Sequence, residues 1–363
     1  MVQTILMNLD TLNPMKKHTF IGPEAIQKIY QLCDELEFGK NVLLVYDKTT
    51  KGLAGDTIAK ILSDYDYNVE GYAITDSNEF NVDYTEAIIK RTKRDFVIGI
   101  GGGKSIDVAK LASYNCDIPW ISVPTAISHD GFASSRSSIT CTNGKESKKA
   151  QSPLGLIGDT NIIFKAPSRN YYSGVMDILS NEIAVYDCML AESKTGRKVD
   201  QEALDISFSC ASEILLNPEE FKNKTQDSIA KLIELGIMSG KAMQLAGDSS
   251  PASGFEHKTS HALDQILKIP KMHGEQVGVG TLGAKAAYEM LGEKTKYSFD
   301  VTLNAFKTIG LPVCYPCLEI SQKDVLEAYM MANKINPGRY TIGNLVEESG
   351  ISWEKILKSR KLI

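Results

Sequence analysis

The sequence lacks several features that would place it in a narrow class of proteins. No apolar run comes near the roughly 18 residues that a membrane-spanning helix needs, so membrane insertion is not expected. Positive charge is not in excess, because 40 Lys and Arg residues stand against 45 Asp and Glu residues. The net charge of -5 argues against a nucleic-acid surface as the main function, although it is compatible with a local basic pocket.

The sequence also lacks the marks of a disulfide framework and of a targeting signal. Its seven cysteines are odd in number and dispersed, which is not typical of disulfide-rich proteins. Cys314 and Cys317 form a single C-x-x-C pair, whereas a structural zinc needs two such pairs, so we expect buried or incidental thiols there. The N-terminal stretch to Lys17 carries Asp10 early and has no basic region followed by an apolar one. The expected location is therefore cytoplasmic.

The length of 363 residues favours two domains over a single core. In the first part of the chain, short apolar runs alternate with segments of helical periodicity. That alternation predicts a parallel sheet covered by helices, with ligands beyond the carboxyl ends of the strands. Strands are expected at 41–47, 68–75, 95–100 and 119–123, and helices at 54–65, 84–91 and 106–113.

Beyond about Lys165 the strand signals almost vanish, and helical periodicity dominates. We therefore expect an all-helical second domain, with helices at 202–216, 227–245 and 274–291. The boundary is placed near residues 166 and 167, which gives domains 1–166 and 167–363. A run of small residues at 278–284 allows close helix packing, either inside the domain or between subunits.

Histidine is rare, yet three of the five histidines fall within seventeen residues. His257 and His261 are four apart and share one helical face. Pro270 then interrupts the chain, and His273 opens a new element that can aim back at the same point. Imidazoles that converge from two elements suit a divalent transition metal, whereas the alternative is a set of satisfied core or surface histidines.

A catalytic zinc with two His ligands needs a third ligand, often a carboxylate. Asp177 is the preferred candidate because it lies in an otherwise apolar helix start, where a carboxylate needs a cation or a hydrogen-bond partner. Asp187 and Asp264 are weaker candidates.

A glycine-rich loop, Gly99-Ile-Gly-Gly-Gly-Lys-Ser-Ile-Asp107, follows a predicted strand and opens a helix. Glycines let the backbone approach a phosphate, and the helix N-terminus offers free N–H groups and a positive dipole end. The loop is therefore a candidate pyrophosphate cradle, with a plain tight turn as the alternative. It matches neither a P-loop, which needs Gly at Ile98, nor a Rossmann fingerprint, which needs Gly at Lys104.

Two further segments suit a nicotinamide dinucleotide. Asp47 ends the first strand of the alternating pattern and can accept hydrogen bonds from an adenosine ribose, which favours NAD. Lys48 and Lys51 lie close by and could attract the 2′-phosphate of NADP, so the choice stays open. The segment 124–134 carries hydroxyls that suit the pyrophosphate and ribose, and Asp130 could bind a substrate hydroxyl. A surface turn and a polar loop are the alternatives.

These motifs together resemble a known superfamily. The set Gly-Gly-Gly-Lys-x-x-Asp, Pro-Thr-x-x-Ser-x-Asp, Asp177, His257-x3-His261 and His273-Gly-Glu is similar to 3-dehydroquinate synthase, glycerol dehydrogenase and iron-type alcohol dehydrogenase. Ser122-Val-Pro-Thr-Ala, Ser128-His-Asp-Gly, Glu256-His-x3-Ser-His-Ala-Leu-Asp and Arg339-Tyr-Thr-Ile resemble the archaeal sn-glycerol-1-phosphate dehydrogenase branch. The resemblance runs from about Phe20 past Thr341. Dehydroquinate synthases carry Glu where Asp177 stands, which counts against that activity.

The resemblance implies a Rossmann-like N-terminal domain, an all-helical C-terminal domain and an active site in the cleft between them. It implies that Asp177, His257 and His273 bind one Zn2+ and that Asp130, Asp177 and His261 face the substrate, with His261 and Asp130 handling protons. The residues expected at NAD(H) or NADP(H) are Asp47, Gly101, Gly102, Gly103, Lys104, Ser105, Ile106, Asp107, Thr125, Ala126, Ile127, Ser128 and Ser134. Lys104 and Ser105 differ from the residues of other members.

The implied reaction is the reversible reduction of dihydroxyacetone phosphate to sn-glycerol 1-phosphate, the backbone of archaeal membrane lipids. Lys148, Lys149, Lys165 and Arg169 are candidate cations for the substrate phosphate because they flank the expected cleft. A homo-oligomer is expected from the resemblance, with no nucleic acid as a partner. The alternatives are a glycerol or other polyol dehydrogenase, a dehydroquinate synthase-like lyase, and a nucleotide-binding regulator with a structural metal.

Overall fold

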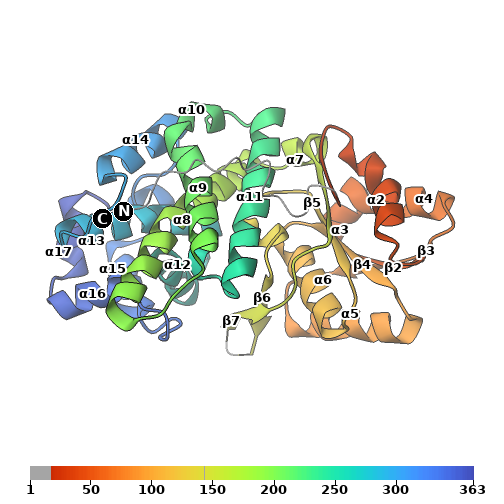
Figure 1. Cartoon of the computed structure of the whole chain (residues 1–363), viewed down its shortest axis with the longest axis horizontal. Coiled ribbons are helices and arrows are strands. Elements are labelled where there is room, and N and C mark those ends of the chain that lie inside the picture. The colour runs from red at the N-terminus through yellow and green to blue at the C-terminus, as the bar shows by residue number, and fades with distance from the viewer. Residues whose placement is uncertain (1–17, 143) are drawn as a thin grey trace. The chain divides into compact units, whose positions relative to one another are not determined.

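The computed structural model describes residues 18–142 and 144–363 (Figure 1). The N-terminal stretch on which the absence of a signal was predicted lies outside the described residues. The described chain divides into two compact units. The sheet unit contains residues 18–171 and 224–244, and the helical unit contains Tyr172–Asn223 and Leu245–Ile363. The segment 224–244 thus packs with the sheet unit, although the expected boundary near residue 166 places it in the second domain.

The sheet unit is built on six parallel strands in the order β1-β8-β5-β4-β2-β3. The four strands expected from the sequence are present, and the prediction of a parallel sheet is confirmed. The edge strand β1 and its neighbour β8 were not predicted, since β1 has four residues and β8 contains two glycines. The strands are β1 (Thr19–Gly22), β2 (Asn41–Asp47), β3 (Asn68–Ile74), β4 (Phe96–Gly101), β5 (Trp120–Pro124) and β8 (Gly155–Asp159).

The strand order reverses between β2 and β4, because β3 lies on one side of β2 and the later strands continue on the other. Such a switch point leaves a crevice at the carboxyl ends of the two strands, where ligands of open α/β sheets bind. Asp47 and Gly101 end these two strands. The topology therefore brings the predicted ribose-binding carboxylate and the glycine loop to the same edge.

Helices cover both faces of the sheet, and Val42–Val45 in β2 are almost fully buried (Figure 1). This double burial explains why the inner strands β2, β4 and β5 read as largely apolar runs rather than as alternating ones. A separate antiparallel hairpin, β6 (Arg136–Cys141) and β7 (Gly144–Lys149), follows β5. The main helices of this unit are α2 (Ile29–Leu36), α4 (Asp56–Asp64), α5 (Glu79–Thr92), α6 (Gly103–Asn115), α7 (Thr160–Lys165) and most of α11 (Gln226–Ala246).

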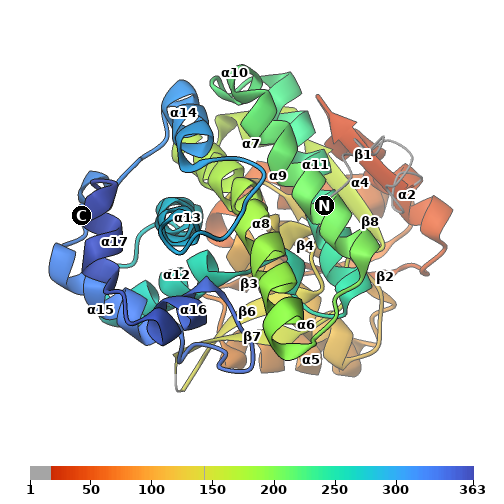
Figure 2. The same ribbon diagram turned by 60° about the vertical axis from the view of Figure 1, so that its left-hand side comes forward.

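The helical unit contains no strand among its described residues, which confirms the predicted class of the second part. Figure 2 views α13 nearly end-on, with α8, α12, α14 and α17 around it. Gly278 packs against Met176 and Gly283 against Tyr329, so the small-residue face of α13 serves packing inside the unit. The helices are α8 (Ser168–Thr195, from Tyr172 on), α9 (Gln201–Leu216), α10 (Pro218–Phe221), α12 (Phe255–Ile266), α13 (His273–Met290), α14 (Phe299–Ile309), α15 (Gln322–Ala332), α16 (Ile342–Ser349) and α17 (Trp353–Ser359).

The structure also bears on the predictions for the cysteine pair and for membrane-spanning helices. Cys314 and Cys317 are joined in a disulfide, so the expectation of incidental thiols was wrong for this pair. The tight turn between α14 and the short 3-10 helix Pro316–Leu318 places their Cα atoms 5.4 Å apart, within disulfide range. No helix of the described chain has the length and hydropathy to cross a membrane.

Candidate active site

Asp177, His257 and His273 come together in the helical unit as a candidate metal site. Asp177 lies on α8, His257 in the first turn of α12, and His273 is the first residue of α13. Asp177 Oδ1 is 3.6 Å from His257 Nε2 and 3.5 Å from His273 Nε2, and one ligand atom from each residue lies within 4.8 Å of the others. The ligand atoms of a tetrahedral zinc, at about 2.0–2.2 Å from the metal, lie roughly 3.3–3.6 Å apart, so both distances from Asp177 fit a shared zinc.

The second nitrogen of each imidazole already has a partner. His257 Nδ1 is 2.9 Å from Glu256 Oε1, and His273 Nδ1 is 3.2 Å from Ser260 Oγ. Ser260 Oγ in turn donates to Gln276 Oε1 at 3.0 Å. Such contacts fix the ring orientation and the tautomer of metal-binding histidines, and here they leave Nε2 of both rings directed at Asp177.

The charge around the site suits a cation. His257 is buried, which lowers the pKa of its imidazole, but hydrogen bonds and charges from Asp177 and Glu256 outweigh burial and raise the pKa to about 10. The surroundings therefore stabilise positive charge at His257, whether it is carried by a proton or by a metal that replaces the proton.

His261 lies one turn beyond His257 on α12, and its ring centroid is 5.9 Å from that of His273. The structure thus gathers all three predicted histidines, with His261 beside the three candidate ligands. The weaker candidates Asp187 and Asp264 lie outside this group. Asp264 Oδ1 accepts from Gln276 Nε2 at 3.1 Å, and Asp187 Oδ2 accepts from Phe255 N at 2.7 Å.

The glycine loop of the sheet unit has the backbone that the cradle hypothesis requires. Gly101 ends β4 with φ 147°, where a side chain would be strained, and a Cβ there would lie 2.9 Å from Ser105 Oγ. A Cβ on Gly103 would lie 2.6 Å from His129 Nε2, whereas one on Gly102 would meet nothing within 4 Å. Gly102 is the N-cap of α6 and offers no side-chain hydrogen bond, so the first N–H groups of the helix are left for an anion.

The remaining predicted residues of this loop have roles inside the protein. Lys104 is exposed and forms an ion pair with Asp76 at 2.9 Å. The side chains of Ser105 and Ile106 are buried, so only their backbone could reach a ligand. Asp107 is also buried, and its Oδ1 lies 3.2 Å from Lys110 Nζ.

Lys110 was missed by the sequence analysis, because a lysine in a helix normally indicates a solvated face. It is fully buried, and its Nζ donates to Gly131 O at 2.5 Å and to Arg136 O at 2.6 Å. Burial lowers the pKa of Lys110, and Asp107 opposes that shift. The side chain thus joins α6 to the segment after β5.

That segment is also held by α11. Asp130 Oδ2 accepts from Ser239 Oγ on α11 at 2.6 Å. The beginning of the segment is held by β4, because Thr125 N donates to Gly101 O at 3.0 Å. Phe132 packs against Gly236 and Ala133 against Gly240, where a larger residue would collide. Of the four other predicted residues in this segment, Ile127 and Ser134 are buried and Ala126 and Ser128 are half-buried.

Two of the residues predicted near the cofactor ribose and 2′-phosphate, Asp47 and Lys51, interact with residues close to them in sequence. Asp47 Oδ1 accepts from Thr49 N and Thr50 N, both at 2.8 Å, and caps the short helix α3 (Lys48–Thr50). Lys51 is paired with Asp56 at 2.8 Å. Among the candidate phosphate cations, Lys148 is paired with Glu79 at 2.8 Å, and Lys149, Lys165 and Arg169 are exposed.

Comparison with known proteins identifies the family. Residues 20–167 match the model of the iron-containing alcohol dehydrogenase family. Glycerol-1-phosphate dehydrogenase (NAD(P)+) of Thermococcus sibiricus is 37% identical over 351 residues, which are 97% of each chain. The enzyme of the same name from Methanococcoides burtonii is 37% identical over 328 residues, 90% of each chain. The chain belongs to the glycerol-1-phosphate dehydrogenase family.

Solved structures extend the family's fold to more distant proteins. Glycerol dehydrogenase from Schizosaccharomyces pombe has a TM-score of 0.74 at 19% identity, covering 95% of this chain and 91% of its own. A probable glycerol dehydrogenase from Sinorhizobium meliloti has a TM-score of 0.73 at 18% identity, covering 90% and 91%. At this identity the likeness concerns the fold alone. The resemblance drawn from the motifs, to the superfamily and to its glycerol-1-phosphate dehydrogenase branch, is confirmed.

Proposed function

We propose that the chain catalyses the reversible, zinc-dependent reduction of dihydroxyacetone phosphate to sn-glycerol 1-phosphate with NADH or NADPH. The observation that carries the proposal is the Asp177–His257–His273 cluster in a member of the glycerol-1-phosphate dehydrogenase family. One carboxylate and two imidazoles are a donor set of catalytic zinc sites, which keep a fourth position for water or substrate.

When bound, zinc supplies Lewis acidity at the C2 carbonyl of the substrate, and the nicotinamide supplies the hydride. Glu256 and Ser260 hold the two imidazoles so that both Nε2 atoms face Asp177. His261 supplies the proton that the C2 oxygen takes up, directly or through water, with Asp130 as the other candidate. The balance is one hydride and one proton added to the carbonyl, with oxidised cofactor released.

The glycine loop is the proposed seat of the cofactor pyrophosphate. The uncapped start of α6 offers N–H groups, and Gly102 leaves the space above them open. Lys110 holds the segment 129–136 that would lie along the nicotinamide ribose. Asp47 supports NAD, and the exposed Lys48 beside it supports NADP, so both cofactors belong in the assay.

Three broader proposals follow from the family resemblance. The product would serve as the glycerophosphate backbone of membrane lipids. The protein would act in the cytoplasm and as a homo-oligomer. Analytical ultracentrifugation of the purified protein measures the last of these directly, and a monomer at micromolar concentration would contradict it.

The deciding experiment measures oxidation of NADH and of NADPH with dihydroxyacetone phosphate, with and without a chelator. We expect a rate that the chelator abolishes and added zinc restores, and a product that an sn-glycerol-3-phosphate-specific dehydrogenase does not oxidise. A chelator-insensitive rate would overturn the zinc mechanism. Faster turnover of glycerol with NAD+ would instead favour a polyol dehydrogenase, and no turnover by zinc-loaded protein would overturn the function.

A further inference from the structure

The start of α12 carries the metal ligand His257 but has no cap of its own. Its N-cap is Gly254, which offers no side-chain acceptor, and Phe255 and Glu256 are fully buried. Up to four N–H groups at a helix start need partners from elsewhere, and a buried N–H without one is costly. The acceptors at this helix start are side chains from distant parts of the chain and from the helix itself.

Asp187 on α8 supplies the first of these acceptors. Its Oδ2 accepts a hydrogen bond from the backbone N–H of Phe255, the first residue of α12, at 2.7 Å. Its Oδ1 accepts from the backbone N–H of Ile342, the first residue of α16, at 2.8 Å. The same oxygen accepts from the Tyr288 hydroxyl on α13 at 2.7 Å. One buried carboxylate therefore joins four helices, and three of them, α8, α12 and α13, each carry a candidate metal ligand.

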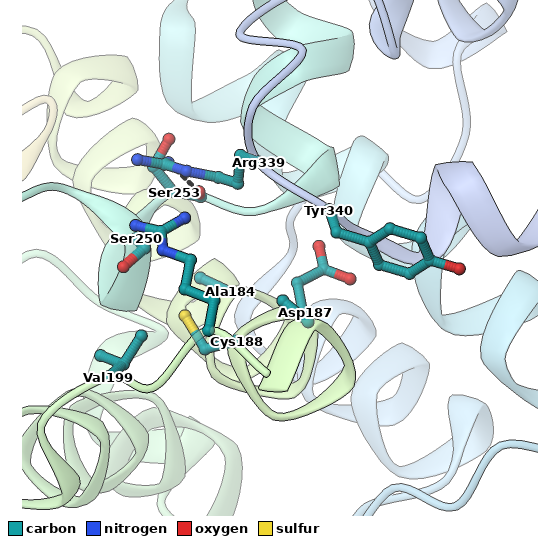
Figure 3. Close-up of a pocket in the computed structure, with 10 residues that line it drawn as sticks. Ala184, Asp187, Cys188, Val199, Ser250, Ser253, Arg339 and Tyr340 are labelled. Atoms are coloured by element: carbon teal, nitrogen blue, oxygen red, sulfur yellow. Dashed lines mark hydrogen bonds between the residues drawn. The ribbon is translucent and has the colours of Figure 1, made fainter. Parts of the chain in front are cut away.

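Arg339 contacts the segment that leads into the same helix start. Its Nη1 donates to Ser253 O at 2.5 Å, and its Nη2 donates to Ser249 Oγ at 3.2 Å. The backbone carbonyl of Arg339 accepts from Nζ of Lys258, a buried residue in the first turn of α12, at 2.6 Å. Figure 3 shows the guanidinium of Arg339 beside Ser253, in the same pocket as the carboxylate of Asp187.

The two side chains belong to one packed region. Both line a small cavity of about 10 Å3, together with Cys188 and Ser250 (Figure 3). That volume holds about one water molecule, so the region has little room to relax. Burying a guanidinium and a carboxylate costs free energy that hydrogen bonds only partly return, so their burial here calls for a geometric reason.

We infer that Asp187 and Arg339 form a clamp that fixes the N-terminal end of α12 and thereby positions His257 for the metal. The inference rests on the metal site of the proposed function. The path is short: Asp187 holds Phe255 N, and Glu256 Oε1 accepts from Gly254 N at 2.6 Å and contacts His257 Nδ1. Both clamp residues are positioning residues, because neither belongs to the candidate ligand set.

The clamp also gives a role to the Arg339-Tyr-Thr-Ile motif that the proposed reaction leaves unexplained. Arg339 grips the segment before α12, and Thr341 caps α16 through a capping box with Asn344. Ile342 N then reaches Asp187. The motif thus contacts the segment before α12 through Arg339 and the carboxylate of Asp187 through Ile342.

The test compares Asp187→Asn and Arg339→Gln with a matched control, Ser298→Ala, which removes the N-cap of α14 in the same unit. Zinc affinity is measured by competition with a chromophoric chelator, and amide hydrogen exchange is measured for peptides that cover 254–258. We expect the clamp variants to bind zinc about 10–100-fold more weakly and to exchange faster at the start of α12. Ser298→Ala should lower the melting temperature without changing either readout.

Wild-type zinc affinity and wild-type exchange in both folded clamp variants would overturn the clamp. If Asp187→Asn does not fold, Tyr288→Phe removes a single hydrogen bond to the same carboxylate and should give a smaller change in both readouts; no change would count against the clamp. Wild-type protein that binds zinc but turns over no substrate would contradict the proposed function and leave the clamp standing. If the wild type binds no zinc, the positioning of His257 for a metal is overturned, whatever the exchange measurement shows at the start of α12.

Discussion

At the scale of single residues, the site depends on how each imidazole is held. His257 and His273 each direct one nitrogen to Asp177 because the other nitrogen contacts Glu256 or Ser260. The spacing of the histidines in the sequence was sufficient to predict a shared site. The roles of Ser260 and Lys110 could not be assigned in the same way, because they depend on contacts with other elements of the fold. The role of Glu256 depends on how its side chain turns toward the neighbouring His257 within α12.

The residue scale carries one prediction about the substrate phosphate. Lys165 is exposed at the end of α7, and its replacement by alanine should raise the KM for dihydroxyacetone phosphate at least about 10-fold if it meets that phosphate, since a charge-assisted hydrogen bond contributes about 1.5–3 kcal/mol. Steady-state kinetics with this substrate and with glycerol measure the effect. Equal losses on both substrates would exclude a phosphate role. Lys358→Ala, an exposed lysine paired with Glu354, is the control.

At the scale of secondary-structure elements, the β4–α6 junction shows what a short motif can and cannot reveal. The glycine run predicts a close approach of the backbone, and the structure shows which glycine is required for which reason. The strands β1 and β8 were missed because a short edge strand and a glycine-containing strand lack a clear apolar run. The long helix α8 was predicted only at Asp177, since its periodicity is weak where it is buried on many sides.

The junction gives a matched pair of variants. Gly101→Ala places a side chain at φ 147° against Ser105 and should destabilise the sheet unit by about 1–3 kcal/mol. Gly102→Ala meets no protein atom within 4 Å, so stability should change little while the KM for NADH rises. Urea unfolding and cofactor titration separate the two effects. A stable Gly101→Ala variant, or unchanged NADH binding in Gly102→Ala, would contradict the cradle.

The element scale also predicts the cost of losing Lys110. Lys110→Met removes the donors to Gly131 O and Arg136 O and leaves the buried Asp107 carboxylate without its cation. Loss of one partner of a buried pair typically costs about 3–5 kcal/mol, which urea unfolding resolves. The double variant Lys110→Met with Asp107→Asn should recover part of this loss. If both variants unfold at the wild-type midpoint, the side chain does not hold the loop.

At the scale of the whole molecule, the proposed metal and cofactor sites lie in different compact units. The class of each unit was predictable from periodicity, since alternating runs give way to helices after residue 165. The return of the chain to the sheet unit at α11 was not predictable, because α11 has the same helical pattern as the helices of the other unit.

This division predicts two separate footprints in hydrogen exchange. Zinc should slow exchange at the starts of α12 and α13, and NADH should slow exchange at 101–107 and 124–134, because each ligand stabilises the elements that bind it. Mass spectrometry of peptic peptides measures both. The variant His257→Ala should lose the zinc footprint and keep the NADH footprint. A zinc footprint on the glycine loop alone would place the metal elsewhere.

The assignment of α11 to the sheet unit means that this unit is discontinuous in sequence, with residues 172–223 inserted between its two parts. A fragment that ends at residue 171 would lack Gly236, Ser239 and Gly240, which cover Phe132, Asp130 and Ala133. We expect that fragment to aggregate or stay partly unfolded, and a version in which a Gly-Ser linker joins residue 171 to residue 224 to fold, as judged by circular dichroism. Exchange of the sheet unit between relatives would accordingly need three crossover points, after residues 171, 223 and 244, rather than one near residue 166.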